Sequence, residues 1–183
     1  MKKYALLLVL PVAVALVLSF KASKKEINVD HPAMNDTILY PDEKHFKNIQ
    51  QLTFGGDNAE AYFSYDGKWL IFQKTYAKEG IPCDQMYIGK IPTKKGEKFI
   101  PKLVSTGKGR TTCGAFMKDG KHIIYASTHL GSSDCPPIPD RSKYGNKYIW
   151  PLYDSYDIFI ADLNGNIVKQ LTNSKGYDAE ATL

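Results

Sequence analysis

The chain has 183 residues, of which 43% are hydrophobic, and this is the length and composition of one globular domain. Its 12 Tyr, 8 Phe and 2 Trp, together with 14 Gly and 10 Pro, favour β-structure with many turns over a helical bundle. The formal net charge of +5 falls to +2 without Lys2, Lys3 and Lys21. No basic patch interleaved with aromatic residues remains, so we expect no nucleic-acid partner.

Residues 1–23 have the pattern of an export signal. Lys2 and Lys3 form a positive start, residues 4–20 form an uncharged and mostly apolar run, and small residues follow. This run is slightly short for a membrane-spanning helix, which needs ~20 residues. A cleaved secretory signal therefore fits best, and a retained N-terminal membrane anchor is the alternative. The protein is expected to be periplasmic or secreted, with membrane contact only through this segment if it is not cleaved.

The sequence becomes repetitive after a polar stretch. Residues 24–44 show no sustained period and are predicted to be a linker. From about residue 45 a pattern recurs. Each copy starts with Leu-Thr or Leu-Val-Ser, followed by a turn rich in Gly or Asp. An aromatic strand, an Asp-Gly hairpin and a buried strand come next. The copies start at Gln51, Leu103 and Gln170. Repeats of this length indicate a repeat architecture.

Each repeat is predicted to form four short strands. We expect the first four at residues 59–65, 69–72, 85–89 and 99–105, and the next four at 113–118, 121–127, 156–162 and 167–172. Repeated four-stranded antiparallel units predict an all-β fold, a partial β-propeller preceded by the apolar helix of the signal. The expected propeller covers residues 45–183, with blades at 54–105 and 106–172 and a third blade truncated at Leu183. Residues 45–53 are expected to add a lone outer strand.

The repeat resembles that of TolB-type propellers. It shares the Leu-Thr pair, Ala-Glu followed by an aromatic residue, and Ser-x-Asp-Gly-Lys before Leu-Ile-Phe. The resemblance covers residues 45–183 and depends on the repetition, because a single Asp-Gly hairpin is common. The second copy departs from the pattern, since Met117 replaces the serine and Cys113 the glutamate. Related blades form the N-terminal propeller of some exported peptidases, so the resemblance implies either a binding scaffold or one part of a hydrolase.

Blade topology predicts which loops share a face. In an up-and-down blade, the turn between the second and third strands lies on the same face as the turn between blades. The loops expected together are residues 54–58, 76–84, 106–111 and 128–155, opposite the Asp-Gly hairpins. Because long loops on a rigid scaffold often carry binding residues, the candidates on this face are Arg110, His129, Tyr144, Tyr148, Trp150 and Tyr153. Alternatively, the aromatic residues of 128–155 fold over their own blade and seal its core.

Three cysteines follow the signal, so at most one internal disulfide forms and one thiol is left over. Cys113 can pair with Cys135 in the adjacent loop or with Cys83 from the neighbouring blade, and the Cys113–Cys135 pair is favoured. Three reduced, packed cysteines are the alternative. A nucleophilic cysteine would need a base, and His129 is the only candidate on that face.

Glu60 and Glu180 occupy equivalent places in the repeat, so both are expected to approach the central channel. Two carboxylates can act as an acid–base pair, but equivalent positions in a repeat more often have equivalent structural roles. The spacing of His129, Asp134 and Cys135 matches no standard zinc pattern, and no metal or cofactor site is predicted.

These observations predict an exported binding or scaffold protein that is not an enzyme. We expect it to present its loop-rich face to a protein, a peptide or a cell-envelope component. Two alternatives remain: the N-terminal propeller of an exported, peptidase-like hydrolase, and a carbohydrate-binding propeller that uses the Tyr- and Trp-rich loop.

Overall fold

The computed structural model describes residues 42–46, 49–94, 96–145 and 147–183, all in one of the two units of the chain, His31–Leu183. The expected signal and most of the expected linker, residues 1–41, lie outside the described residues. The described residues contain nine strands and two short 3-10 helices, and no α-helix. The all-β prediction is confirmed.

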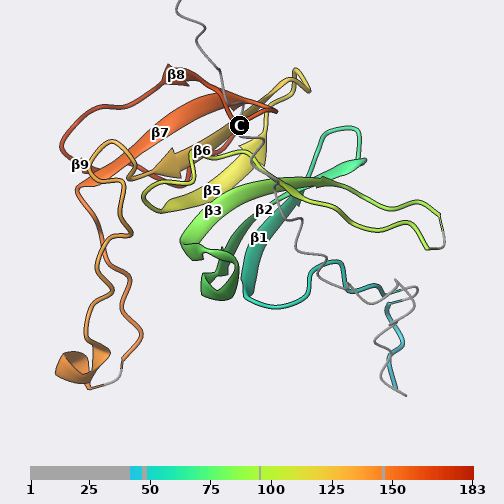
Figure 1. The fold of residues 1–183 in the computed structure, drawn as a ribbon, viewed down its shortest axis with the longest axis horizontal. Helices are drawn as coiled ribbons and strands as arrows, with labels where there is room; N and C mark the ends of the chain where they lie inside the picture. Colours follow the sequence, from blue (N-terminus) through green and yellow to red (C-terminus); the bar gives the residue numbers. More distant parts are fainter. Residues whose placement is uncertain (1–41, 47–48, 95, 146) are drawn as a thin grey trace, which may run out of the picture. The chain divides into compact units, whose positions relative to one another are not determined.

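Four antiparallel strands form the first sheet, and their order in space is their order in the chain (Figure 1). The strands are β1 (Asp57–Phe63), β2 (Trp69–Tyr76), β3 (Ile81–Lys90) and β4 (Lys102–Leu103). A single 3-10 turn, η1 (Ala77–Glu79), joins β2 to β3. These strands fall where the sequence predicts them, although β4 is much shorter than the predicted strand at residues 99–105.

The second sheet repeats this order, β5-β6-β7-β8. Its strands are β5 (Thr111–Phe116), β6 (His122–Ser127), β7 (Ser155–Asp162) and β8 (Ile167–Gln170). A short β9 (Gly176–Tyr177) then pairs with β7 in the parallel direction. The expected first strand of a third repeat thus forms only this two-residue strand. A lone outer strand was expected at residues 45–53, and the described residues of this segment, 45, 46 and 49–53, contain no strand.

The Asp-Gly pairs lie at the β1–β2 and β5–β6 hairpins, but in wider loops than the predicted two-residue turns. Ser64 N–H donates to Trp69 O, which leaves four residues in the first loop. Asp66 accepts hydrogen bonds from the Ser64 hydroxyl and the Lys68 N–H, and Gly67 has φ +69°. The Asp side chain organises the loop, and Gly supplies the left-handed backbone conformation.

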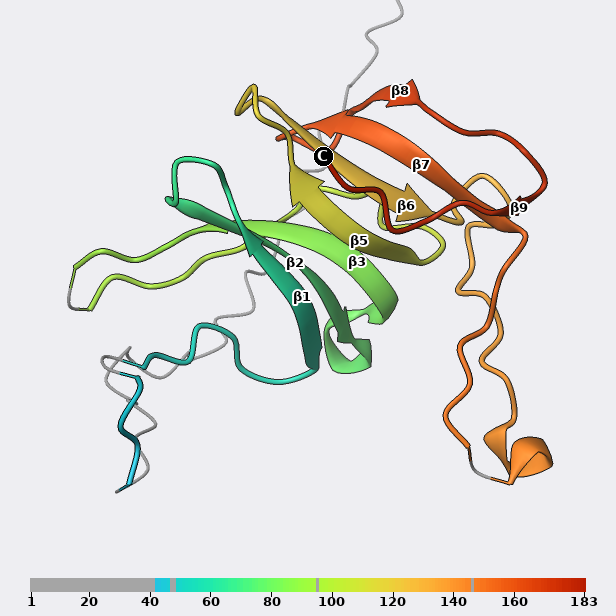
Figure 2. The ribbon, with the colours of Figure 1, turned by 180° about the vertical axis from the view of Figure 1, so that it is seen from behind.

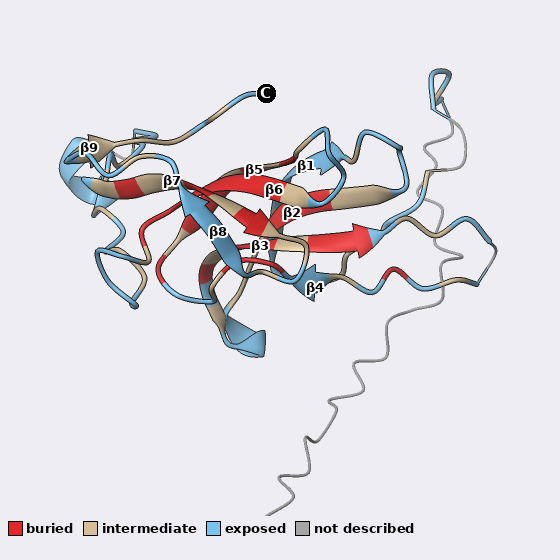
Figure 3. Cartoon of the chain, turned by 90° about the horizontal axis from the view of Figure 1, so that it is seen from above, coloured by how far each residue is buried: buried red, intermediate tan, exposed pale blue. Residues whose placement is uncertain are grey.

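The core lies between the two sheets, where buried residues of both concentrate (Figure 3). The first sheet contributes Ile71, Met86 and Ile88, and Val104, the residue after β4, joins them. The second sheet contributes a larger set: Phe116, Ile123, Tyr125, Phe159 and Ala161. Alternation along the strands explains why Met86 and Ile88 of β3, and Ile123 and Tyr125 of β6, lie on the same face of their sheets.

Close packing of β5 on the first sheet depends on Gly114. A Cβ atom added there would meet Met86 Cε and would lie 3.1 Å from Ile71 Cδ1. The other repeats carry alanine at the aligned positions, Ala61 and Ala181. Glycine at position 114 is therefore explained by the long side chain of Met86.

We predict that Gly114→Ala lowers the free energy of unfolding by about 1–3 kcal/mol, because the added methyl group overpacks the contact with Met86. Urea denaturation measures the loss. The double variant G114A/M86I should recover part of it, since isoleucine lacks the terminal methyl group that the new Cβ meets. A loss of stability in G114A that M86I leaves unchanged or worsens would contradict this account.

Candidate functional site

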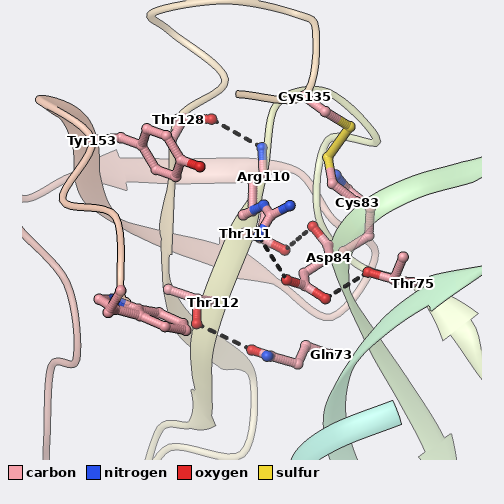
Figure 4. A network of polar contacts seen from close by, with 12 residues as sticks. Gln73, Thr75, Cys83, Asp84, Arg110, Thr111, Thr112, Thr128, Cys135 and Tyr153 are labelled. Carbon is pink, nitrogen blue, oxygen red and sulfur yellow. Dashed lines mark hydrogen bonds and ion pairs between the residues drawn. A yellow bond between two sulfur atoms is a disulfide. The ribbon is translucent and has the colours of Figure 1, made fainter. Parts of the chain in front are cut away.

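Of the four loops predicted to share a face, two, 76–84 and 106–111, meet the first part of a third, 128–135, beside the ends of β2, β3 and β5. The Arg110 guanidinium Nη1 lies 3.7 Å from Asp84 Oδ2, and both side chains are about one-fifth exposed. The same carboxylate accepts a 2.6 Å hydrogen bond from the Thr75 hydroxyl, and the Thr111 hydroxyl donates to the Asp84 carbonyl (Figure 4). Arg110 Nε is buried without a partner among the described residues.

A second row of polar contacts continues this network between the sheets. The Thr112 hydroxyl donates to Gln73 Oε1, and the Gln85 amide donates to the Gly109 carbonyl. Gln85 Oε1 accepts in turn from the Ser105 hydroxyl. Gln73, Gln85, Ser105 and Thr112 are all buried. Because a buried polar group without a hydrogen-bond partner is unfavourable, these bonds stabilise the packing of the two sheets.

The disulfide joins Cys83 to Cys135, with 5.9 Å between their Cα atoms, and Cys113 is free. The predicted Cys113–Cys135 pair is therefore wrong. Cys113 lies on the bulged part of β5, whereas Cys83 lies near the start of β3 at the loop face. The Gly109 N–H also donates to the Ser133 carbonyl. Both links hold the start of the inserted loop against the first sheet.

Residues 128–155, which we call the arm, start beside the sheets at 128–135, then extend away from both sheets (Figures 1 and 2) and return to the start of β7 at Ser155. The alternative in which their aromatic rings seal the core is wrong for the outer part of the arm. Tyr148 is 72% exposed, Tyr144 55% and Trp150 47%. The described residues of the arm contain one helical turn, η2 (Arg141–Tyr144), near its far end.

Side-chain hydrogen bonds and prolines stiffen the arm. The Tyr153 hydroxyl donates to the Pro137 carbonyl at 2.7 Å, which joins its two limbs. Trp150 Nε1 donates to the Tyr177 hydroxyl at 2.9 Å, which ties the arm to the segment after β8. Asp140 caps η2 by accepting from the Ser142 N–H, and the sequence supplies four prolines between residues 136 and 151. Proline fixes φ and limits the conformations of the unbound loop.

His129 does not join the exposed aromatic residues. Its Nδ1 lies 2.9 Å from the Ser127 hydroxyl, and its ring packs 4.5 Å, centroid to centroid, from Phe159. Burial lowers the pKa of His129, so the neutral imidazole is favoured. These contacts are typical of a packed histidine rather than of a catalytic base.

Glu60, Cys113 and Glu180 meet in a second place, next to an open hollow of about 600 Å³. They occupy the same position in three successive repeats, and all three have left-handed φ values, of 49°, 53° and 61°. Irregularities in β1 and β5 begin at this position, between Ala59 and Tyr62 and between Thr112 and Ala115. Such φ values are uncommon outside glycine and aim a side chain away from the regular strand direction.

Burial raises the pKa of the Cys113 thiol to about 11, and the nearby Glu60 and Glu180 carboxylates add to the shift. A thiol that stays protonated at neutral pH is a poor nucleophile. The structure therefore favours a packed cysteine over the catalytic cysteine considered from the sequence.

The structure thus divides the predicted site residues into groups. Arg110, Tyr153 and Trp150 lie at the base and along the arm, Tyr144 and Tyr148 lie at its far end, and His129 packs inward. Asp84 and Tyr177 were missed from the sequence. Asp84 follows the cysteine of the disulfide but belongs to no motif, and Tyr177 lies in the expected inner strand of the third repeat.

Among the described residues, no cluster of three or more His, Cys, Asp or Glu side chains has an arrangement that could hold a metal ion. The same part of the chain contains no helix long and apolar enough to cross a membrane.

Replacing both disulfide cysteines, as C83S/C135S, should lower the free energy of unfolding by about 2–4 kcal/mol, because the bridge restricts a 52-residue separation in the unfolded chain. Urea midpoints measured with and without reductant provide the test. Reductant should shift the wild type and C113S by the same amount and leave C83S/C135S unchanged. Sensitivity to reductant that persists in C83S/C135S would show that the bridge is assigned wrongly.

The thiol of Cys113 should react slowly with iodoacetamide. The pKa of the thiol is raised from 9.0 to about 11, so its thiolate fraction near neutral pH is about a hundredfold lower than in the unfolded chain. The rate of alkylation should fall by the same factor, because the thiolate is the reacting form. The rate should rise with pH until about pH 11. Glu60→Gln should speed the reaction by removing a carboxylate that opposes ionisation. Fast labelling at neutral pH in the folded wild type would refute the assignment of a protonated, packed thiol.

Comparison with known proteins assigns no family to the chain. No protein-family model, no curated protein and no solved structure matches it. The resemblance to TolB-type propellers therefore remains an interpretation of the sequence repeats. The function has to be inferred from the residues of the chain and their contacts.

Proposed function

We propose that the chain is part of an exported β-propeller that works as a binding protein and presents the arm to a component of the cell envelope. The observation that carries this proposal is the arm itself. It is anchored by the Cys83–Cys135 disulfide and exposes Tyr144, Tyr148 and Trp150 to solvent. Rigid aromatic side chains on a stiff support give contact area at a low entropic cost.

The repeated geometry of the sheets supports a propeller. Each sheet has four antiparallel strands in chain order, and each begins with a strand that bulges at the same repeat position, Glu60 or Cys113. Glu180 takes the same left-handed conformation after β9, next to both of them. Three equivalent residues that meet at one place are expected if successive sheets are arranged around an axis. A crystal structure of the natural protein with an isolated two-sheet sandwich would contradict the ring.

Two features support export. The pattern of residues 1–23 is that of a secretory signal, and a disulfide persists mainly in oxidising compartments. The disulfide also holds the arm in place, so oxidation and ligand binding are linked in this proposal.

A non-catalytic role fits the chemistry of the site. Asp84 and Arg110 are engaged with each other, His129 is packed on Phe159, and the Cys113 thiol has a raised pKa. The alternative is a propeller domain of an exported hydrolase, and none of the described residues specifically supports it. The carbohydrate-binding alternative would use the same exposed rings, because flat aromatic faces also stack on sugars.

The proposal predicts that the purified protein binds isolated cell envelopes and that Y144S/Y148S weakens binding by about tenfold or more, as expected for two central aromatic contacts. Co-sedimentation over a range of envelope concentrations measures this change. The matched control is Y62S/Y65S, which removes two tyrosines of similar exposure, 51% and 59%, from the opposite hairpin.

Equal weakening by both pairs, or absence of envelope binding, would overturn the binding proposal. Competition by soluble envelope sugars would favour the carbohydrate alternative. Unchanged thermal unfolding of Y144S/Y148S would show that the effect arises at the binding surface.

A further inference from the structure

The far end of the arm, residues 138–148, combines positive charge with exposed rings. Three cations lie in this arm tip: Arg141, Lys143 and Lys147. Its one acidic residue is Asp140, whose carboxylate already accepts hydrogen bonds from the N–H and hydroxyl of Ser142. The tip therefore carries a net charge of +2 within eleven residues, as much as the whole chain carries after residue 23. The expectation that no basic patch interleaved with aromatic residues remains is thus wrong for this short segment.

Apolar groups surround these charges. Ile138 is 74% exposed, and Tyr144 and Tyr148 are also largely exposed. The Arg141 guanidinium lies 5.5 Å from the centre of the Tyr148 ring, so charge and aromatic surface are adjacent. No ion pair of the described residues involves Arg141, Lys143 or Lys147, which leaves their charge available to a partner.

This composition fits a membrane surface better than a protein surface. Tyrosine prefers the interface between hydrocarbon and water, and lysine and arginine side chains can extend their charge toward lipid headgroups. Lysine is depleted from the buried centres of protein interfaces, and its ammonium group lacks the bidentate geometry that recognises one defined carboxylate. It is well suited to the diffuse negative charge of anionic lipids.

The arm also places this tip where a flat surface can reach it. The described residues of the tip, 138–145, 147 and 148, stand away from both sheets (Figures 1 and 2), and 140–145 have a defined conformation. Asp140 caps the start of η2, and Gly145 ends it with a left-handed backbone and an N–H that bonds to the last turn. The bonds of Tyr153 and Trp150, described above, hold the limbs behind it. Little ordering is therefore needed on binding.

We propose that the arm tip docks on an anionic phospholipid surface, with Tyr144, Tyr148 and Ile138 at the interface and the three cations among the headgroups. This inference rests on the proposed envelope-binding function and names the component that the arm contacts. It also differs from the expectation that only the N-terminal segment contacts a membrane.

The test is co-sedimentation of the purified protein, lacking residues 1–23, with vesicles of phosphatidylglycerol and phosphatidylcholine in equal parts. Vesicles of phosphatidylcholine alone are the comparison. Binding should occur only with the anionic vesicles and should weaken as salt rises, because screening shortens the range of the attraction. K143E/K147E should weaken binding by about tenfold or more, since each cation near the surface contributes to it.

A matched variant separates local from overall charge. K118E/K121E makes the same change in net charge at two exposed lysines of the β5–β6 hairpin, and it should leave vesicle binding nearly unchanged. Y148S should weaken binding severalfold, whereas Y65S should not. Equal effects of K118E/K121E and K143E/K147E would overturn the arm tip as the docking site.

The outcome also distinguishes this inference from the proposed function. If the protein binds envelopes through its arm but not anionic vesicles, and protease treatment of the envelopes abolishes binding, the partner is a protein and the lipid inference fails. If neither envelopes nor vesicles bind, both proposals fail.

Discussion

The packing of β5 against β2 and β3 is the contact on which the described structure depends. Gly114 of β5 lies against Ile71 and Met86, and polar groups of the two sheets meet along the same strands. Thr112 then reaches Gln73, and Arg110 reaches Asp84. The apolar core and the polar network thus belong to the same contact between the sheets. The network is satisfied within the interface, which makes the relative position of the sheets specific.

That position in turn determines where the arm begins. Cys83 lies near the start of β3 of the first sheet, and Cys135 lies in the insertion between β6 and β7 of the second. A disulfide between them is possible only because the sheets bring the loop face together. The insertion consequently leaves the body in a defined direction, and its prolines and side-chain hydrogen bonds preserve that direction toward the tip. A surface held in this way loses little conformational entropy when it binds.

The repeat position of Glu60, Cys113 and Glu180, at which β1 and β5 bulge, is subject to a different constraint. Left-handed backbone at Glu60, Cys113 and Glu180 is unfavourable for residues with a Cβ atom, typically by about 1–3 kcal/mol each, and is kept only where the surroundings require it. Its recurrence in three repeats indicates a common packing requirement rather than a special role for one carboxylate. Cys113 differs from the two glutamates in charge, yet it adopts the same conformation. Its raised pKa follows from this half-buried place beside two carboxylates.

Local pattern in the sequence determined the positions of the main strands, because alternation of apolar residues and Asp-Gly turns depend on near neighbours. It did not determine the short β4 or the absence of a strand in the described part of 45–53. It also determined that residues 76–84, 106–111 and 128–155 share a face, since the up-and-down order of strands leaves no other arrangement. The cysteine pairing, the inward packing of His129 and the roles of Asp84 and Tyr177 were decided by the tertiary structure. Each depends on the distance between segments far apart in the chain, which the separation and registration of the two sheets set, and no local pattern encodes that distance.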